Sequence, residues 1–227
     1  MRAAPRFWAE PPGLLAGLLM PAGAAWDAAG RLREAVVRPY RAPAPVLCVG
    51  NLVAGGAGKT PVALGLASHL IAHGTMVHFV TRGYGGRLGG PVRVDPVRHD
   101  AAAVGDEALL LARKAPIWVA RDRAAGVRAA VAAGADIVLL DDGLQNPTVA
   151  KTLSILVVDA AHGFGNGRVI PAGPLRESLS RGLAKADALV LLAAEAETAR
   201  PAQIAVHSGL PVLPGTLAPI RGERLAG

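Results

Sequence analysis

A glycine-rich loop that leads directly into Lys59 and Thr60 predicts the chemistry of this sequence more strongly than any other feature. Its core reads Gly-Gly-Ala-Gly-Lys-Thr over 55–60. Glycines let a backbone approach a ligand closely, and amides at a helix N-terminus attract phosphate oxygens. A lysine here would reach the terminal phosphates of a nucleoside triphosphate, and the threonine hydroxyl would ligate Mg²⁺. The nucleotide-binding residues expected on this basis are Val53, Ala54, Gly55, Gly56, Ala57, Gly58, Lys59 and Thr60.

The loop departs from the usual phosphate-binding pattern at one position. The pattern places a glycine six residues before the lysine, where this sequence has Val53. A flexible glycine turn before an ordinary helix is the alternative. An apolar run over 46–49 and a helix-like stretch over 59–73 flank the loop, and this strand–loop–helix context favours a phosphate site.

Two pairs of carboxylates are candidates for metal binding and proton transfer. Asp141 and Asp142 directly follow a buried, strand-like run over 137–140, an arrangement that holds Mg²⁺ near a phosphate loop. Asp106 and Glu107 precede a helix-like stretch, where acidic residues are also common because the helix dipole favours them. In the functional interpretation, one of this second pair is the base for a substrate hydroxyl and the other is a metal partner.

Further polar groups lie in glycine-rich segments. Arg82 and Tyr84 occur in Arg-Gly-Tyr-Gly-Gly, a sequence suited to binding a phosphate or a sugar. Arg176 and Glu177 end the segment Pro-Ala-Gly-Pro-Leu-Arg-Glu and could bind an anion and a hydroxyl group. The histidines at 69 and 73 share a helix face, but we expect no metal there.

The elements that must position these groups alternate along the chain. Strand-like runs occur at 46–49, 77–81, 117–120, 137–140, 154–158, 188–192 and 211–213, and helix-like stretches at 59–73, 105–114 and 122–133. Such alternation predicts an α/β fold with a doubly wound, mostly parallel sheet. Ligands of such sheets bind at the carboxyl ends of the strands, and the polar motifs follow strands.

Composition narrows the class of protein further. The chain has 227 residues, of which 52% are hydrophobic, and this excludes disorder as its main state. The formal charge of +7 favours anionic partners such as nucleotides or phospholipid headgroups. The basic residues are dispersed without an aromatic–basic stacking pattern, so we expect no nucleic-acid binding. The single cysteine, Cys48, allows no internal disulfide, which fits a reducing cytosol.

The N-terminal segment over 1–44 differs in character from the rest. An apolar run over 13–26 follows two arginines and resembles a signal peptide, but Glu10-Pro11-Pro12 interrupts the transition. The run is too short to span a bilayer. We expect an amphipathic, membrane-associating segment, or alternatively a helix packed on the core. The remainder, 45–227, is expected to be the phosphate-loop domain.

Six ordered motifs resemble those of the lipid A 4′-kinases (tetraacyldisaccharide 4′-kinases) of Gram-negative bacteria. They occupy 49–61, 82–86, 104–108, 141–145, 163–167 and 171–177. The resemblance implies a P-loop NTPase-like fold and ATP- and Mg²⁺-dependent phosphorylation of the 4′-hydroxyl of a tetraacyldisaccharide 1-phosphate. It also implies peripheral attachment to the cytoplasmic face of the inner membrane.

The resemblance also assigns roles by position. Asp106 looks like the catalytic base, and Lys59, at the terminal phosphates, is the other catalytic residue. Glu107, Asp141 and Asp142, with Thr60, would be the metal and transition-state neighbours. The implied substrate-binding residues are Arg82, Tyr84, Gln145, Arg176 and Glu177.

Two departures from the family pattern leave alternatives open. Asn146 stands where the family has a histidine, and family members continue into a further lobe with an Asp-His-His motif. One alternative is therefore a nucleotide- and membrane-binding module without turnover. Another is a P-loop ATPase or GTPase of the partitioning or metal-insertion type, although those proteins often carry a lysine where this chain has Ala54. The sequence makes no prediction of oligomeric state.

Overall fold

A single mixed sheet organises the protein in the computed structural model, which describes residues 4–193 and 208–217. The strand order is β3-β4-β2-β5-β1-β6-β7-β8, and all neighbours are parallel except β3 and β4. The strands are β1 (Val46–Gly50), β2 (Val77–Thr81), β3 (Val92–Arg93), β4 (Ile117–Val119), β5 (Ile137–Asp141), β6 (Leu153–Asp159), β7 (Ala188–Leu192) and β8 (Val212–Gly215).

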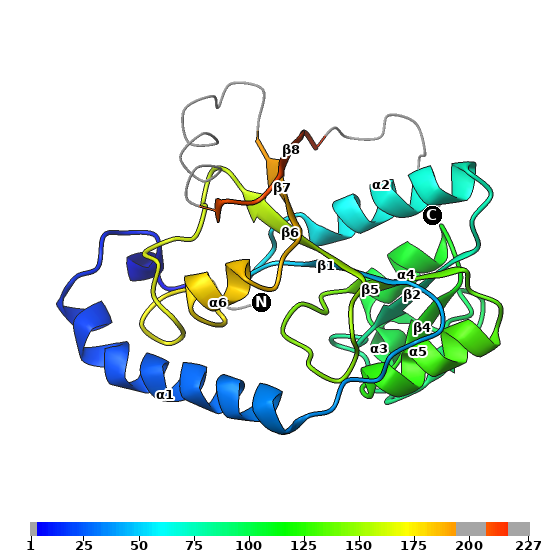
Figure 1. The fold of residues 1–227 in the computed structure, drawn as a ribbon, viewed down its shortest axis with the longest axis horizontal. Helices are drawn as coiled ribbons and strands as arrows, with labels where there is room; N and C mark the ends of the chain where they lie inside the picture. The colour runs from blue at the N-terminus through cyan, green and yellow to red at the C-terminus, as the bar shows by residue number, and fades with distance from the viewer. Residues whose placement is uncertain (1–3, 194–207, 218–227) are drawn as a thin grey trace.

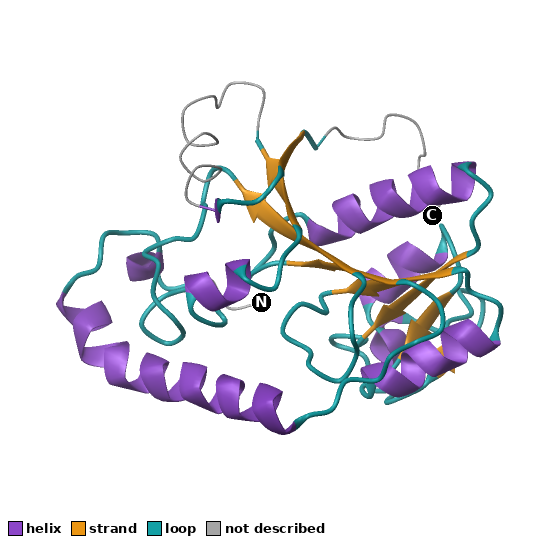
Figure 2. Ribbon diagram, viewed as in Figure 1, coloured by secondary structure: helices purple, strands orange, loops and turns teal. Residues whose placement is uncertain are grey.

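Helices cover both faces of this sheet (Figure 2). They are η1 (Arg6–Trp8), α1 (Leu14–Val36), α2 (Lys59–Ala72), α3 (Ala101–Val104), α4 (Asp106–Ala112), α5 (Arg123–Ala132) and α6 (Leu179–Leu183). Alternate strand residues point to opposite faces, so Val49 and Leu139 pack with α2 and α4 while Cys48 and Leu140 pack with α5. Alanines dominate the helix faces and allow the helices to lie close to the sheet.

The seven expected strands and the α/β fold class are confirmed, with small shifts at the strand ends. The short β3 and α6 were not expected, because neither shows a clear apolar period. The helix expected over 105–114 begins at Asp106. Gly105, at φ 90°, separates it from α3.

Helix α1 lies along one side of the molecule, beside α6 and away from α2 (Figure 1). It continues through Pro21. Its buried face consists of Ala16, Gly23 and Asp27. A side chain on Gly23 would place Cβ 2.9 Å from the carbonyl oxygen of Val169, so glycine allows the helix to approach this loop. The helix is therefore packed on the domain.

Candidate functional site

The glycine-rich loop connects β1 to α2 at the carboxyl edge of the sheet. Gly58 adopts a left-handed conformation at φ 75°, and α2 begins immediately after it. Asn51 is fully buried, and its Nδ2 donates to the carbonyl oxygens of Val53 at 2.9 Å and Gly55 at 3.4 Å. These two hydrogen bonds fix the backbone of the loop from its buried side. Gly55 and Gly56 remain exposed, and the first amides of α2 are free of helical bonding.

Lys59 points toward the carboxylates that follow β5. Its Nζ lies 4.0 Å from Oδ2 of Asp142, and its side chain is mostly buried. Asp142 has φ 55°, a conformation that a residue other than glycine rarely adopts. Arg176 holds its carboxylate, with Nη1 2.8 Å from Oδ1 and 2.9 Å from Oδ2. Asp142 is thus turned into the site and paired with two cations.

Asp141 is buried at the end of β5, and its Oδ1 has no hydrogen-bond partner in the described part of the chain. Burial raises its pKa to about 7, and the negative charges of Glu107 and Asp142 add to this effect. Lys59 and Arg123 act in the opposite direction but do not offset it. A buried carboxylate oxygen without a donor is a hard ligand suited to Mg²⁺.

The described residues contain no group of three or more carboxylate, histidine or cysteine side chains placed to hold a metal ion by themselves. Mg²⁺ in nucleotide sites is usually held by one or two carboxylates together with phosphate oxygens and water. The expected set of Thr60, Glu107, Asp141 and Asp142 is therefore not a preformed cage. Its residues nevertheless fit a metal that arrives with a nucleotide.

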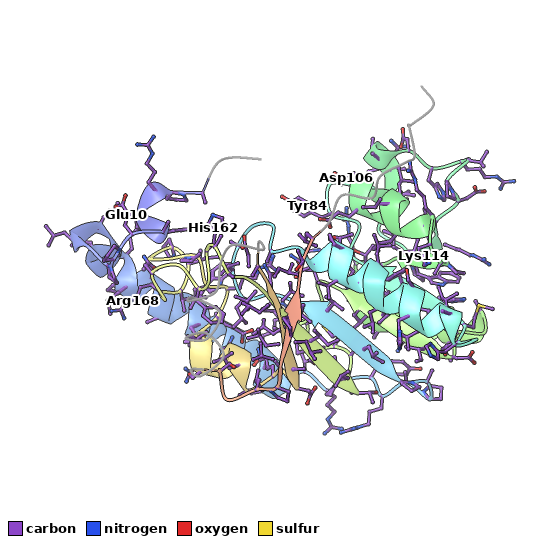
Figure 3. The ribbon with its side chains drawn as sticks, turned by 90° about the horizontal axis from the view of Figure 1, so that it is seen from above. Glu10, Tyr84, Asp106, Lys114, His162 and Arg168 are labelled. Atoms are coloured by element: carbon purple, nitrogen blue, oxygen red, sulfur yellow. The ribbon has the colours of Figure 1, made fainter. Side chains whose placement is uncertain are left out.

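Two loops that follow β2 and α3 are packed together through glycines. A Cβ on Gly105 would lie 2.5 Å from the carbonyl oxygen of Tyr84, and one on Gly86 would lie 2.7 Å from the carbonyl carbon of Val104. This close packing brings Tyr84 next to Asp106, the first residue of α4 (Figure 3). Both side chains are exposed, so they are accessible to a ligand.

A hollow of about 280 Å³, which we call the polar hollow, lies between the segments that follow β2, β4 and β5 and the start of α4. Five arginines and two carboxylates lie among its lining residues, so it is strongly cationic. Its lining is Arg33, Thr81, Arg82, Tyr84, Glu107, Arg121, Arg123, Asp142, Gln145, Asn146 and Arg176. The structure therefore brings together Arg82, Tyr84, Gln145 and Arg176, the expected substrate-binding residues other than Glu177.

Three arginines of the polar hollow were missed by the sequence analysis. Arg121 and Arg123 follow β4, and a search for polar residues after each strand would have found them. Arg123 is 5% exposed, its Nη1 donates to the carbonyl oxygen of Ala120 at 2.9 Å, and its Nε has no partner among the described residues. Burial lowers its pKa, and the positive charge of Arg82 adds to this effect. Arg33 comes from α1, and only tertiary packing brings it here.

Glu177 lies outside the polar hollow, and the structure does not support its expected contact with substrate. Its side chain is fully buried and pairs with Arg181 and Lys185 of the α6 region. The preceding residue, Arg176, faces the hollow, so two successive residues of this irregular segment have opposite surroundings. A carboxylate covered in this way has no access to a substrate hydroxyl.

Gln145 and Asn146 occupy the turn after Asp142. Gln145 Nε2 donates to the carbonyl oxygen of Asn51 at 3.0 Å and thereby joins this turn to the residue that follows β1. Asn146 Oδ1 accepts from the amide of Thr148 at 2.8 Å and from its hydroxyl at 2.7 Å. The amide that replaces the expected histidine therefore shapes its own turn at the rim of the hollow.

The glycine-rich loop borders another cavity, of about 330 Å³. Residues 53–57 form one wall, and Trp8, Asp159 and His162 contribute to the others. His162 Nδ1 lies 2.9 Å from Oδ2 of Asp159. The outer part of the loop is therefore open to this cavity.

The outward face of α1 is apolar. Leu14, Leu18, Leu32 and Val36 are each at least two-thirds exposed, and at 3.6 residues per turn they fall within about 40° of one line. Trp26 is also more than half exposed. Within the part of the chain that the structure describes, no helix combines the length and apolar character needed to cross a bilayer.

The parallel sheet, the loop between β1 and α2 and the carboxylates after β5 define an α/β protein of the P-loop NTPase type. A family model described as tetraacyldisaccharide-1-P 4′-kinase matches residues 15–226. The chain belongs to this family.

Individual relatives agree with this assignment. The chain is 60% identical over 220 residues to the tetraacyldisaccharide 4′-kinase of Rhodospirillum centenum, covering 95% of this chain and 64% of that protein. It is 56% identical over 233 residues to that of Dinoroseobacter shibae, covering 98% and 68%. A solved structure of LpxK from Aquifex aeolicus in complex with ATP matches with a TM-score of 0.71 and 27% identity, covering 88% of this chain and 64% of that one. The chain thus spans about two thirds of the length of these relatives.

Proposed function

We propose that this protein is an ATP-dependent kinase that phosphorylates the 4′-hydroxyl of a tetraacyldisaccharide 1-phosphate in lipid A biosynthesis. The observation that carries the proposal is the polar hollow beside the P-loop, with Lys59 4.0 Å from Asp142 and five arginines in the lining. Such a site favours reactants that carry phosphate groups. Its family membership supports the choice of acceptor.

The P-loop residues are suited to holding the ATP phosphates. The open glycines and the start of α2 supply amide donors, and Lys59 supplies a positive charge for the terminal phosphate. The cavity of about 330 Å³ that the loop borders has room for the nucleoside. Mg²⁺, held by Thr60 and Asp141 with support from Glu107 and Asp142, would neutralise charge that develops on the transferred phosphoryl group.

Asp106 is the proposed general base. Its carboxylate is exposed beside Tyr84 and next in sequence to Glu107 of the polar hollow. From there it would accept the proton of the attacking hydroxyl. Arg82, Tyr84, Gln145 and Arg176 would orient the acceptor, whose phosphate favours an arginine-rich surface.

The exposed apolar face of α1 supports attachment to the surface of a membrane that contains the lipid acceptor. Leucines with flanking tryptophan and arginines are the composition of an interfacial helix. We place the protein on the cytoplasmic face of the inner membrane, where ATP is present. Its partners in this proposal are the lipid disaccharide and the membrane surface.

The test is transfer of labelled phosphate from Mg·ATP to a tetraacyldisaccharide 1-phosphate in mixed micelles. We expect transfer by the wild-type chain. The Asp106→Asn variant should lose about 10²–10⁴-fold in kcat with little change in ATP affinity, because a general base acts on the chemical step. Binding of ATP without transfer would instead identify a nucleotide-binding module. ATP hydrolysis that ignores the acceptor would refute the proposed substrate.

A further inference from the structure

A cluster of buried ion pairs joins α1 to α6. Asp27 lies on α1, and its Oδ1 is 3.1 Å from Nη1 of Arg181. Arg181 Nε also donates to Oε2 of Glu177 at 2.7 Å. Lys185 contacts Glu177 and lies 2.5 Å from Oε1 of Glu34, again on α1. Glu177 therefore stands at the centre of a network that spans two helices.

The two central carboxylates of the network are buried deeply enough to depend on their partners. Glu177 is 0% exposed and Asp27 is 7% exposed. Burial alone would raise the pKa of Asp27, but the amide of Ser178 and the charge of Arg181 reverse this effect and lower it. Removing one member of a buried pair leaves an uncompensated charge, so the geometry of these helices is tightly linked.

A glycine makes the contact between the helices specific. A Cβ on Gly30 would lie 2.9 Å from Nη2 of Arg181. The guanidinium of Arg181 also donates from Nη1 to the carbonyl oxygen of Asp27 at 2.9 Å. Arg181 thus lies against the backbone of α1, and the helix cannot slide without breaking both contacts.

The segment that carries Arg176 is bonded to α1 on one side. Trp26 Nε1 donates to the carbonyl oxygen of Arg176 at 3.0 Å. The amide of Ser178 donates to Oδ1 of Asp27 at 2.9 Å. Two successive residues of α1 therefore hold the backbone on either side of Glu177.

The same segment is bonded to the P-loop on its other side. The amide of Arg176 donates to the carbonyl oxygen of Leu52 at 2.8 Å, and the amide of Ala54 donates to that of Pro174 at 2.8 Å. The side chain of Arg176 continues to Asp142. The segment is therefore a direct structural connection between α1 and the nucleotide site.

We propose that Asp27 and Glu177 are positioning residues that fix the segment 174–178 between α1 and the P-loop. They act through Arg176, whose guanidinium they hold on Asp142, and through the backbone bonds at 52–54. Movement of α1 would accordingly move the edge of the P-loop. The catalytic consequence rests on the proposed kinase function, whereas the structural connection is testable without turnover.

Hydrogen exchange of the 227-residue chain tests the connection. In Asp27→Asn and Glu177→Gln, we expect exchange at the amides of Ala54 and Arg176 to accelerate about tenfold, as for loss of one hydrogen bond to a charged group. Exchange in β2 and β5 should not change. Asp122→Asn is the matched control, because Asp122 caps α5 and asparagine caps a helix equally well, and it should leave exchange at both amides unchanged. Acceleration confined to α1, or spread evenly over the whole sheet, would overturn the proposal.

Kinetics with the lipid acceptor test the route through Arg176. Asp27→Asn should lower kcat about tenfold and change the acceptor KM less than twofold, and Asp27→Glu should partly restore kcat. In an Arg176→Ala background, Asp27→Asn should lower kcat clearly less than it does in the wild type, because only the backbone bonds at 52–54 then remain, whereas full additivity would refute the route. If the wild-type chain transfers no phosphate, the proposed function fails, and hydrogen exchange still decides the connection.

Discussion

Asn in place of Asp141 should remove a pH dependence of folding stability that this one carboxylate creates. The pKa of Asp141 is about 7 in the folded protein, against an ordinary value of 3.8, because the carboxyl group is buried and lies near the negative charges of Glu107 and Asp142. The folded state therefore binds a proton that the unfolded state releases between about pH 4 and pH 7. The stabilisation from this proton is complete below that window and is lost as pH rises through it.

The size of the change in the free energy of unfolding follows from the difference between the two pKa values of Asp141. Each pH unit between the two pKa values changes the free energy of unfolding by about 1.4 kcal/mol, so the wild type should lose about 2.5 kcal/mol between pH 5 and pH 8 from this group. Asn cannot ionise and has nearly the same shape. The variant should therefore equal the wild type only below about pH 4, and its advantage over the wild type should be about 2.5 kcal/mol larger at pH 8 than at pH 5.

Urea unfolding at pH 5 and pH 8, without nucleotide or Mg²⁺, measures this difference. Asp122→Asn is the matched control, because Asp122 caps α5 and asparagine caps a helix equally well. It should keep the wild-type pH dependence. An Asp141→Asn variant with an unchanged pH dependence, or with lower stability at pH 8, would refute the assignment of a raised pKa to this carboxylate.

Three further outcomes follow from the P-loop, from α1 and from the packed glycines. Lys59→Ala should weaken ATP binding at least about tenfold by calorimetry, because a charge-assisted bond to phosphate contributes about 1.5–3 kcal/mol. An unchanged affinity would contradict the binding of the ATP phosphates by Lys59. Leu14→Ser combined with Leu18→Ser should reduce pelleting with anionic vesicles at least about tenfold, since full burial of each leucine contributes about 1.5–3 kcal/mol. The exposed Met76→Ser serves as the control, and equal pelleting of all forms would argue against an interfacial α1. Gly83→Ala should lower the free energy of unfolding by about 2–4 kcal/mol, because its Cβ would lie 2.5 Å from Cγ1 of Val119. Gly85→Ala, with positive φ but open space, should cost about 1 kcal/mol, and equal losses for the two would contradict the steric explanation.

The sequence alone was sufficient for the parallel strands of the sheet and for the edge at which the polar residues meet, but not for β3. Runs such as 46–49 and 137–140 are apolar on both faces of a strand, a pattern that is typical of a parallel sheet covered on both sides. The polar residues that follow them must then meet at one edge. Lys59, Asp141 and Asp142 were found in this way, because local sequence and strand direction together determine their place.

Tertiary structure decided which neighbours of those residues face the site. Arg176 and Glu177 are adjacent in sequence and equally polar, yet one reaches Asp142 and the other is buried beneath α1. Arg33 lines the polar hollow only because α1, which carries it, packs beside α6, a helix far away in the sequence. The orientation of a side chain on an irregular segment depends on contacts with distant residues, and no local period encodes such contacts.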